Sequence, residues 1–219
     1  MPLKIDSIRK SFDQRPILKD IFLSCERGEI VGLFGRNGSG KSTLLKIVYK
    51  QIDADHCHVS AEGNALISAT EISQYINYLP QDTMLPSNEK ARTLIKIFVH
   101  NQWIEHVENL PQIKPLLHHK CKTLSFGQLR CLEILLVLYG HGQYALLDEP
   151  FHGLAPLLVD QIKIHIQHAS KTKGIILTDH SYRNVLDIAT NMFVLANGRT
   201  IRVQNQEDLR RFGYLPNLK

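Results

Sequence analysis

Several features that would indicate particular protein classes are missing from this sequence of 219 residues. It has no stretch of about 18 or more consecutive apolar residues, so we predict no membrane-spanning segment. Residues 1–6 lack the charged and then apolar pattern of a secretory signal, and we expect none. We also find no heptad pattern, no internal repeat and no low-complexity segment. A membrane-spanning, secreted or coiled-coil protein is therefore not expected.

Cysteine is scarce, with four residues and no C-x-x-C pair, which favours free thiols in a reducing compartment. Two short segments, His-Cys-His at 56–58 and His-His-Lys-Cys at 118–121, contain residue types that bind metals. Neither has the spacing of a closed zinc site. We interpret both segments as loop or strand-start residues.

Neither positive nor negative charge is concentrated in one part of the sequence. Lysine and arginine number 26 and acidic residues 21, which gives a net charge of +5. A basic balance can indicate nucleic acid or anionic lipid as a partner. Because the positive charges are dispersed along the chain, we expect no direct nucleic-acid partner.

The hydrophobic content of 43% is enough for a globular core, and the length suggests one domain, or one domain with an inserted subdomain. Short apolar runs predict buried strands at 30–34, 144–147 and 174–177. Further strands are expected at 3–12, 17–25, 65–68 and 76–79, with a hairpin at 192–203. Helices are expected at 41–50, 89–103, 125–140, 156–171 and 182–188. This alternation predicts an α/β fold with a mostly parallel sheet and an antiparallel N-terminal addition.

A glycine-rich segment follows the strand at 30–34 and precedes the helix at 41–50. It matches the phosphate-binding pattern G-x-x-x-x-G-K-S in full. Glycines let backbone N–H groups turn inward around an anion, at the positive end of the next helix. We expect Lys41 to reach the β- and γ-phosphates of a nucleotide and the Ser42 hydroxyl to bind Mg²⁺. The predicted binding residues are Gly35, Arg36, Asn37, Gly38, Ser39, Gly40, Lys41, Ser42 and Thr43.

A pair of acidic residues follows the apolar strand expected at 144–147. Asp148 and Glu149 follow this strand directly, and the carboxyl ends of parallel strands line the ligand crevice. We expect Asp148 to hold Mg²⁺ and Glu149 to orient or deprotonate the attacking water. Taken alone, the pair could equally be a polar turn before Pro150.

Leu124-Ser125-Phe126-Gly127-Gln128 resembles the signature motif of ABC ATPases and lies upstream of the acidic strand, as in that family. Its residues also form a predicted helix capping box, Ser125 with Gln128. The two interpretations are compatible, because a helix N-terminus can bind an anion. In the family this motif contacts ATP held by the opposite subunit. The resemblance therefore implies that Ser125, Gly127 and Gln128 bind nucleotide in a head-to-tail dimer.

Three further positions match the family. Gln81 lies where the family has its Q-loop glutamine, near Mg²⁺ and the membrane partner. His180 matches the switch histidine that contacts the γ-phosphate, and Phe12 lies in place of the aromatic residue that stacks on adenine. Alone, each would be an ordinary core, surface or capping residue. The resemblance covers nearly the whole chain, and within the family it is similar to small ATPases of bacterial export systems, including the lipopolysaccharide-transport type.

The resemblance implies a single P-loop NTPase domain over residues 1–219, with an antiparallel β subdomain and a short helical subdomain inserted at about 84–141. It implies ATP and Mg²⁺ as cofactors, with Ser42, Gln81 and Asp148 at the metal. It implies catalysis by Glu149 with help from Lys41, Gln81 and His180. The expected partners are an integral-membrane permease and a second ATPase subunit, at the cytoplasmic face of the cell membrane.

The sequence departs from the family in three places. Leu154-Ala155 replaces the usual Leu-Asp, Phe126 replaces a more usual glycine, and residues 82–124 are few for the helical subdomain. The missing carboxylate keeps a second hypothesis open, an ATP-binding regulatory or soluble-assembly module with weak hydrolysis. A third, a DNA-linked ATPase of the family, is not favoured because such proteins carry long coiled coils or extra domains.

Overall fold

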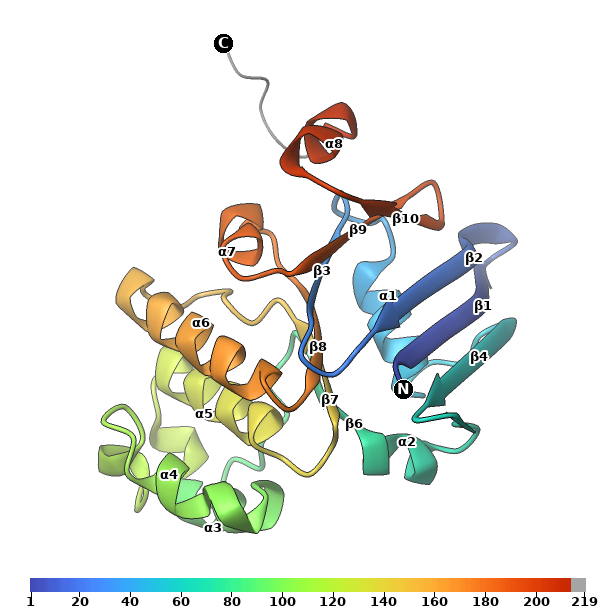
Figure 1. Cartoon of the computed structure of the whole chain (residues 1–219). Helices are drawn as coiled ribbons and strands as arrows, with labels where there is room; N and C mark the ends of the chain where they lie inside the picture. The colour runs from blue at the N-terminus through green and yellow to red at the C-terminus, as the bar shows by residue number, and fades with distance from the viewer. Residues whose placement is uncertain (214–219) are drawn as a thin grey trace.

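The computed structural model describes residues 1–213 of the chain (Figure 1). Its centre is a ten-stranded mixed sheet with the order β5-β4-β1-β2-β10-β9-β3-β8-β7-β6. The strands are β1 (Leu3–Phe12), β2 (Arg15–Cys25), β3 (Ile30–Phe34), β4 (His56–Ala61), β5 (Asn64–Ala65), β6 (Ile76–Leu79), β7 (Tyr144–Asp148), β8 (Gly174–Thr178), β9 (Asn191–Ala196) and β10 (Arg199–Val203). The α-helices are α1 (Lys41–Val48), α2 (Ala69–Tyr75), α3 (Ala91–Phe98), α4 (Ile104–Glu108), α5 (Phe126–Leu138), α6 (Pro156–Ser170), α7 (Tyr182–Leu186) and α8 (Gln206–Arg211).

The sheet has a parallel part and an antiparallel part, as expected. Strands β3, β8, β7 and β6 pair in parallel, and β9 pairs in parallel with β3. The N-terminal strands β1, β2, β4 and β5 pair antiparallel. A parallel contact between Asp20 and Arg199 joins the two parts. The predicted α/β fold with an antiparallel addition is therefore confirmed.

The predicted hairpin is formed by β9 and β10, which pair antiparallel from Ala196 and Arg199 outward. Its two turn residues, Asn197 and Gly198, have φ angles of 52° and 77°. Positive φ at both positions matches the twist of the flanking strands, and asparagine and glycine tolerate it best. The Asn-Gly pair is thus the local cause of this turn.

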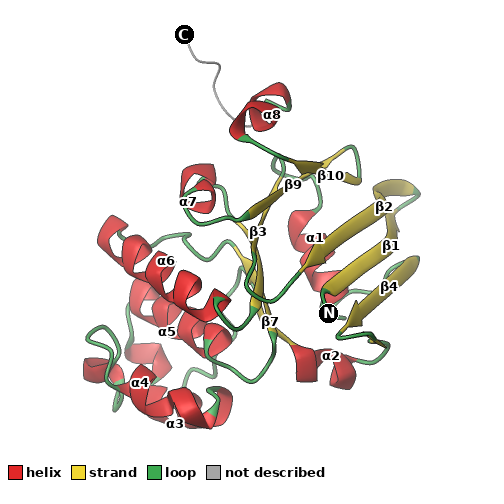
Figure 2. Ribbon diagram, in the orientation of Figure 1, coloured by secondary structure: helices red, strands yellow, loops and turns green. Residues whose placement is uncertain are grey.

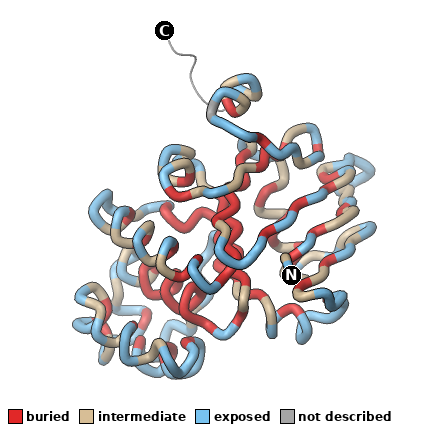
Figure 3. Tube along the Cα trace, viewed as in Figure 1, coloured by how far each residue is buried: buried red, intermediate tan, exposed pale blue. Residues whose placement is uncertain are grey.

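Both faces of the parallel strands are buried, which explains their continuous apolar runs. On β7, Ala145 and Leu147 pack toward α5 and α6, whereas Tyr144 and Leu146 pack toward α1. Figure 2 shows α5 and α6 side by side on one face, with α1 between the parallel strands and the antiparallel strands β1 and β2. The buried stretches converge on these central strands (Figure 3). The sheet is therefore a rigid base for loops at its edge.

One helix is shorter than predicted. The sequence favours a helix over 89–103, but α3 ends at Phe98 and a short 3-10 helix, η1 (Asn101–Trp103), follows. The chain is extended at Val99, which bridges to Gly140, and the N–H of His100 donates to the carbonyl of Tyr139 at 2.9 Å. Pairing with a distant segment overrides the local helical pattern here.

The prediction of a strand at 65–68 is wrong beyond Ala65. Strand β5 ends at Ala65, and Ser68 instead caps α2, a helix that the sequence analysis does not predict. The Ser68 hydroxyl accepts from the N–H of Glu71, whose carboxylate accepts from the N–H of Ser68. This capping box has the same Ser-x-x-Glu/Gln spacing as the one at Ser125, so the signal was present in the sequence.

A cluster of aromatic side chains joins η1 and the end of α5 to α6. The Tyr139 hydroxyl hydrogen-bonds to Nδ1 of His165 at 3.0 Å and to Nδ1 of His168 at 3.2 Å, and Trp103 packs against both Tyr139 and His168. Burial lowers the pKa of His165 to about 4, so this imidazole is neutral at pH 7. That residues 84–141 form an inserted subdomain stays a prediction.

None of the helices described within residues 1–213 is long and apolar enough to cross a bilayer. All four cysteines are free thiols, and three of them, Cys25, Cys121 and Cys131, are buried.

Candidate nucleotide-binding site

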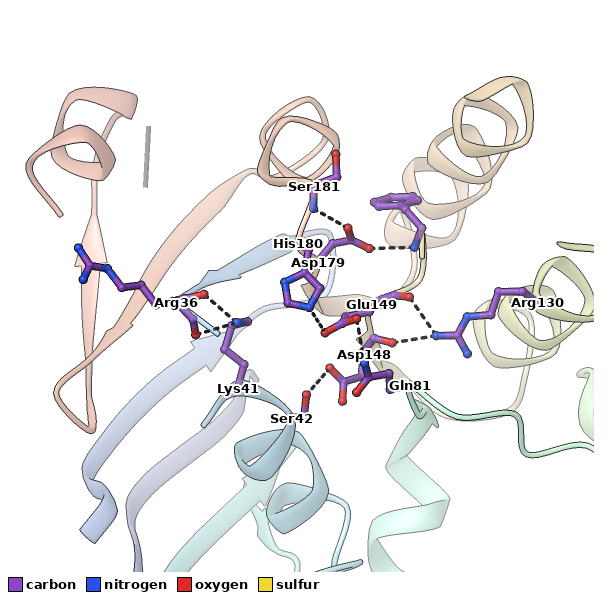
Figure 4. Close-up of polar contacts among 12 residues, drawn as sticks. Arg36, Lys41, Ser42, Gln81, Arg130, Asp148, Glu149, Asp179, His180 and Ser181 are labelled. Atoms are coloured by element: carbon purple, nitrogen blue, oxygen red, sulfur yellow. Dashed lines mark hydrogen bonds and ion pairs between the residues drawn. The ribbon is translucent and has the colours of Figure 1, made fainter. Parts of the chain in front are cut away.

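The predicted site residues follow the carboxyl ends of the parallel strands. The glycine loop comes after β3, Gln81 after β6, Glu149 after β7 and His180 after β8. Because these strands run in parallel, their carboxyl ends meet at one edge of the sheet. Figure 4 shows the side chains of Lys41, Gln81, Glu149 and His180 converging there.

The glycine loop is built to hold an anion. Gly38 and Gly40 have φ angles of 77° and 103°, and a Cβ on Gly40 would meet Ile17 at 2.9 Å. Helix α1 begins with no side-chain cap and no acidic residue in its first turn, so its N–H groups stay available. The Ser39 hydroxyl oxygen is buried with no hydrogen-bond partner within the described chain. A phosphate would supply the missing acceptor for these donors.

Lys41 lies inside this loop and is buried. Its ammonium donates to the carbonyl of Gly35 at 2.7 Å and to that of Arg36 at 3.4 Å. Burial lowers the pKa of Lys41, while the carboxylates of Glu149 and Asp148 oppose that shift. The cation is thus held at the loop by carbonyl oxygens, which a phosphate oxygen can replace.

Two side chains with oxygen atoms of the kind that Mg²⁺ prefers as ligands meet across the site. The Ser42 hydroxyl donates to Oδ1 of Asp148 at 3.0 Å, and Asp148 is fully buried. Burial raises the pKa of Asp148, and the bond from Ser42 opposes that shift. A buried carboxylate beside a hydroxyl and a phosphate-binding loop is an oxygen donor set that fits Mg²⁺.

Glu149 occupies the centre of the site in a strained backbone conformation, with φ of 51°. Its N–H donates to the carbonyl of Thr178 at 2.8 Å, which fixes the turn. One carboxylate oxygen accepts from Nε2 of Gln81 at 3.1 Å, and the other lies 2.8 Å from Nε2 of His180. Strain at a non-glycine residue with positive φ is typical of functional positions. The structure brings Gln81, Glu149 and His180 together, and their catalytic roles stay predictions.

Asp179 is a site residue that the sequence analysis missed. Its carboxylate accepts from the N–H of Phe151 at 2.9 Å and from the N–H of Ser181 at 2.8 Å. These bonds tie the turn that carries His180 to the segment after Glu149 (Figure 4). An acid directly after the buried strand β8 was the available signal.

A buried ion pair between Arg130 and Glu133 was also missed. Arg130 donates to the carbonyl of Pro80 at 2.8 Å, to that of Asp148 at 2.8 Å and to that of Glu149 at 3.0 Å. It also donates to the Glu133 carboxylate at 3.3 Å, and both side chains are 2% exposed.

Glu133 in turn accepts from the Thr83 hydroxyl and from the N–H of Met84. The ion pair of Arg130 and Glu133 therefore links α5 to the segment that carries Gln81 and to the turn that carries Glu149. Two opposite charges three residues apart in an otherwise apolar helix were the signal in the sequence.

The residues around the loop enclose a pocket of about 430 Å³. It is lined by Phe12, Ile17, Asn37, Gly38, Ser39, Gly40, Lys41, Ser42, Thr43, Gln81, Glu149 and His180. Of these, only Ile17 was not predicted. Gly35 and Asp148 do not line the pocket but bond to Lys41 and Ser42, and Arg36 lines a neighbouring one.

The signature residues do not line this pocket of their own chain. They form the predicted capping box at the start of α5, in which the Ser125 hydroxyl accepts from the N–H of Gln128 at 3.3 Å. The Gln128 side chain accepts from the N–H of Ser125 at 2.9 Å. The structure thus confirms the helix cap and leaves the nucleotide contact of Ser125, Gly127 and Gln128 as a prediction.

Comparisons with known proteins agree with this geometry. The family described as ABC transporter matches residues 18–152. The lipopolysaccharide export system ATP-binding protein LptB of Haemophilus influenzae is 28% identical, over 95% of each chain. A probable ABC transporter ATP-binding protein of Azorhizobium caulinodans is 26% identical, over 92% of this chain and 76% of that one.

Solved structures show the same fold. An ATP-binding subunit of an ABC transporter superposes with a TM-score of 0.85 at 22% identity, covering 98% of this chain and 94% of the other. A nucleotide-free ATP-binding cassette gives 0.79 at 22% identity, covering 99% and 96%. The chain therefore belongs to the ABC transporter family, as an ATP-binding subunit that hydrolyses ATP to drive a membrane transporter.

Proposed function

We propose that this chain hydrolyses Mg²⁺-bound ATP at a site completed by a second ATPase subunit, and that the pair drives a separate integral-membrane permease from its cytoplasmic face. The observation that carries this proposal is the convergence of Gln81, Glu149 and His180 on the phosphate loop. These three side chains approach the position where water would meet a γ-phosphate.

Phosphoryl transfer to water depends mostly on positioning and on charge stabilisation. Lys41 and the N–H groups at the start of α1 neutralise the phosphate charge. Ser42 and Asp148 would hold Mg²⁺, which would neutralise more of that charge. Phe12, which is 43% exposed at the pocket wall, provides a face for adenine.

Glu149 is the residue that orients and deprotonates the attacking water. Its carboxylate already accepts hydrogen bonds, so a water can replace one of the present partners. We infer that His180 is the partner that moves, because its side chain is 47% exposed and it matches the switch histidine that contacts the γ-phosphate in the family. On release from Glu149, the His180 imidazole can reach the γ-phosphate.

A second subunit is needed for the signature residues to act. Ser125, Gly127 and Gln128 do not line the pocket of their own chain, and they open a capped helix N-terminus that can face an anion. In a head-to-tail pair, each subunit offers this terminus to the nucleotide of the other. The protein named LptB serves lipopolysaccharide export, and we propose the same class of partner here, an integral-membrane permease.

The proposal predicts that the purified chain hydrolyses ATP only with Mg²⁺, at a rate that rises more steeply than in proportion to protein concentration. Ser42→Ala removes the hydroxyl beside Asp148, so it should lower the rate at least about tenfold at limiting Mg²⁺. Phosphate release at several Mg²⁺ and protein concentrations measures both effects.

Ser73→Ala, the same change on the exposed face of α2, is the matched control and should have no effect. ATP binding without turnover at any concentration would instead support the regulatory module. A rate strictly proportional to protein concentration would contradict the paired site.

A further inference from the structure

The Asp148 carboxylate is held by a second hydroxyl besides that of Ser42. Tyr78, on β6, donates its phenol hydroxyl to Oδ2 of Asp148 at 3.5 Å. Ser42, at the start of α1, donates to the other carboxylate oxygen, Oδ1, at 3.0 Å (Figure 4). Each oxygen of the carboxylate therefore accepts a hydrogen bond from a different element of the fold.

Strand pairing places Tyr78 on the same face of the sheet as Asp148. Strand β6 pairs in parallel with β7, and Tyr78 lies beside Leu146, two residues before Asp148. Residues two apart on a strand point to the same face. Tyr78 and Leu146 both pack in the core cluster that contains the apolar residues of α1. The phenol therefore approaches Asp148 from the interior of the protein, on the side that α1 covers.

Both partners of this bond are buried. Tyr78 is 4% exposed and Asp148 is 0% exposed, and the Tyr78 ring packs against Tyr49 with the ring centres 5.1 Å apart. A buried phenol hydroxyl needs a partner within the protein, and a hydrogen bond is stronger where water is excluded. None of the ion pairs formed within residues 1–213 includes Asp148. The two hydroxyls therefore determine how this carboxylate is oriented.

We propose that Tyr78 is a positioning residue for Mg²⁺, because its hydroxyl keeps the Asp148 carboxylate turned so that Oδ1 stays beside Ser42. The inference rests on the proposed function, since it deepens the metal site of that reaction. Tyr78 does not line the nucleotide pocket, so it acts through Asp148 alone. A serine oxygen has two lone pairs as well as its proton, so Ser42 can bind a cation and still donate to Oδ1.

Tyr78→Phe tests this role, because it keeps the ring and removes the hydroxyl. Removing the hydrogen-bond partner of a metal ligand typically weakens the metal site tenfold or more, so the free Mg²⁺ concentration for half-maximal turnover should rise about tenfold. At saturating Mg²⁺ and ATP, turnover should stay within about threefold of the unmodified protein, because mass action refills a weakened site. Phosphate release over a series of free Mg²⁺ concentrations measures both quantities.

Binding of a fluorescent ATP analogue provides a measurement that does not depend on turnover. In EDTA, the unmodified protein and Tyr78→Phe should bind the analogue equally, because Tyr78 does not line the pocket. On addition of Mg²⁺, the gain in affinity should be about tenfold smaller in the variant, since weaker metal binding is linked to weaker binding of the metal–nucleotide complex.

Tyr49→Phe is the matched control. It makes the same chemical change in the ring that packs on Tyr78, at the C-terminal end of α1. The Mg²⁺ dependence of turnover and the affinity for the analogue should both stay as in the unmodified protein. Urea unfolding checks that each variant is folded under the conditions of the assays.

An unchanged Mg²⁺ dependence in Tyr78→Phe would overturn the inference. So would an equal loss of ATP affinity with Mg²⁺ and in EDTA, because the hydroxyl would then support the pocket as a whole and not the metal ligand. If the unmodified protein hydrolyses ATP equally well without Mg²⁺, the proposed metal site itself has failed, and not only the role of Tyr78.

Discussion

Replacing Glu149 with glutamine should slow ATP hydrolysis at least about tenfold while ATP binding is retained. Glutamine has nearly the same shape and can still contact Gln81 and His180, but it cannot accept a proton from water. Glu149 lines the pocket but is not part of the phosphate loop, so the contacts of that loop with ATP remain. Phosphate release and the binding of a fluorescent ATP analogue measure the two properties separately.

Glu105→Gln provides the matched control for this change. Glu105 is exposed on α4, and its neutralisation should leave both turnover and binding unaltered. Undiminished turnover in Glu149→Gln would mean that another group activates the water, and the role given to Glu149 would have to be abandoned.

Arg130→Met should destabilise the protein by about 3–5 kcal/mol, because it leaves Glu133 as a buried charge without its cation. The change also removes donors from the carbonyls of Pro80, Asp148 and Glu149. Since these bonds position the segments of Gln81 and Glu149, turnover should fall in the fraction that remains folded. Urea unfolding and phosphate release under stabilising conditions measure the two effects.

The exposed ion pair between Arg92 and Glu108 is the control for the buried pair between Arg130 and Glu133. Arg92→Met breaks the bond from Arg92 to Glu108, but the Arg92 side chain is 46% exposed and such pairs contribute about 0–1 kcal/mol. Arg130→Lys keeps the charge but loses the forked geometry, so its effect should lie between the two. A loss below about 1 kcal/mol in Arg130→Met would show that the buried network does not hold the site together.

Much of the candidate site at the carboxyl ends of the parallel strands could be predicted, because it follows from local sequence patterns. The glycine loop and the two acids at the end of β7, Asp148 and Glu149, are short, contiguous segments whose chemistry depends on neighbouring residues. Parallel pairing then brings the strand ends together, which the alternation of strands and helices already indicated. Gln81 and His180 are assigned to this edge of the sheet by the resemblance to ABC ATPases, because neither residue is informative alone.

What could not be predicted depends on contacts between distant segments. The bonds of Arg130 to the carbonyls of Pro80 and Glu149 join positions 50 and 19 residues away in sequence. The end of α3 depends on pairing of Val99 with Gly140. The positive φ of Glu149 has no sequence signal, because glutamate rarely adopts it.

The central claim is that each ATP site is made by two chains, the phosphate loop of one and the signature turn of the other. Mixing two inactive variants tests it most directly. Lys41→Ala disables the loop and Ser125→Arg disables the signature, so a mixed pair contains one intact site and one doubly altered site. With equal amounts and free exchange, half of the pairs are mixed, and activity should return to about a quarter of that of the unmodified protein. If neither variant is active alone and the mixture stays inactive, or if Ser125→Arg alone hydrolyses ATP at the normal rate, the account is contradicted.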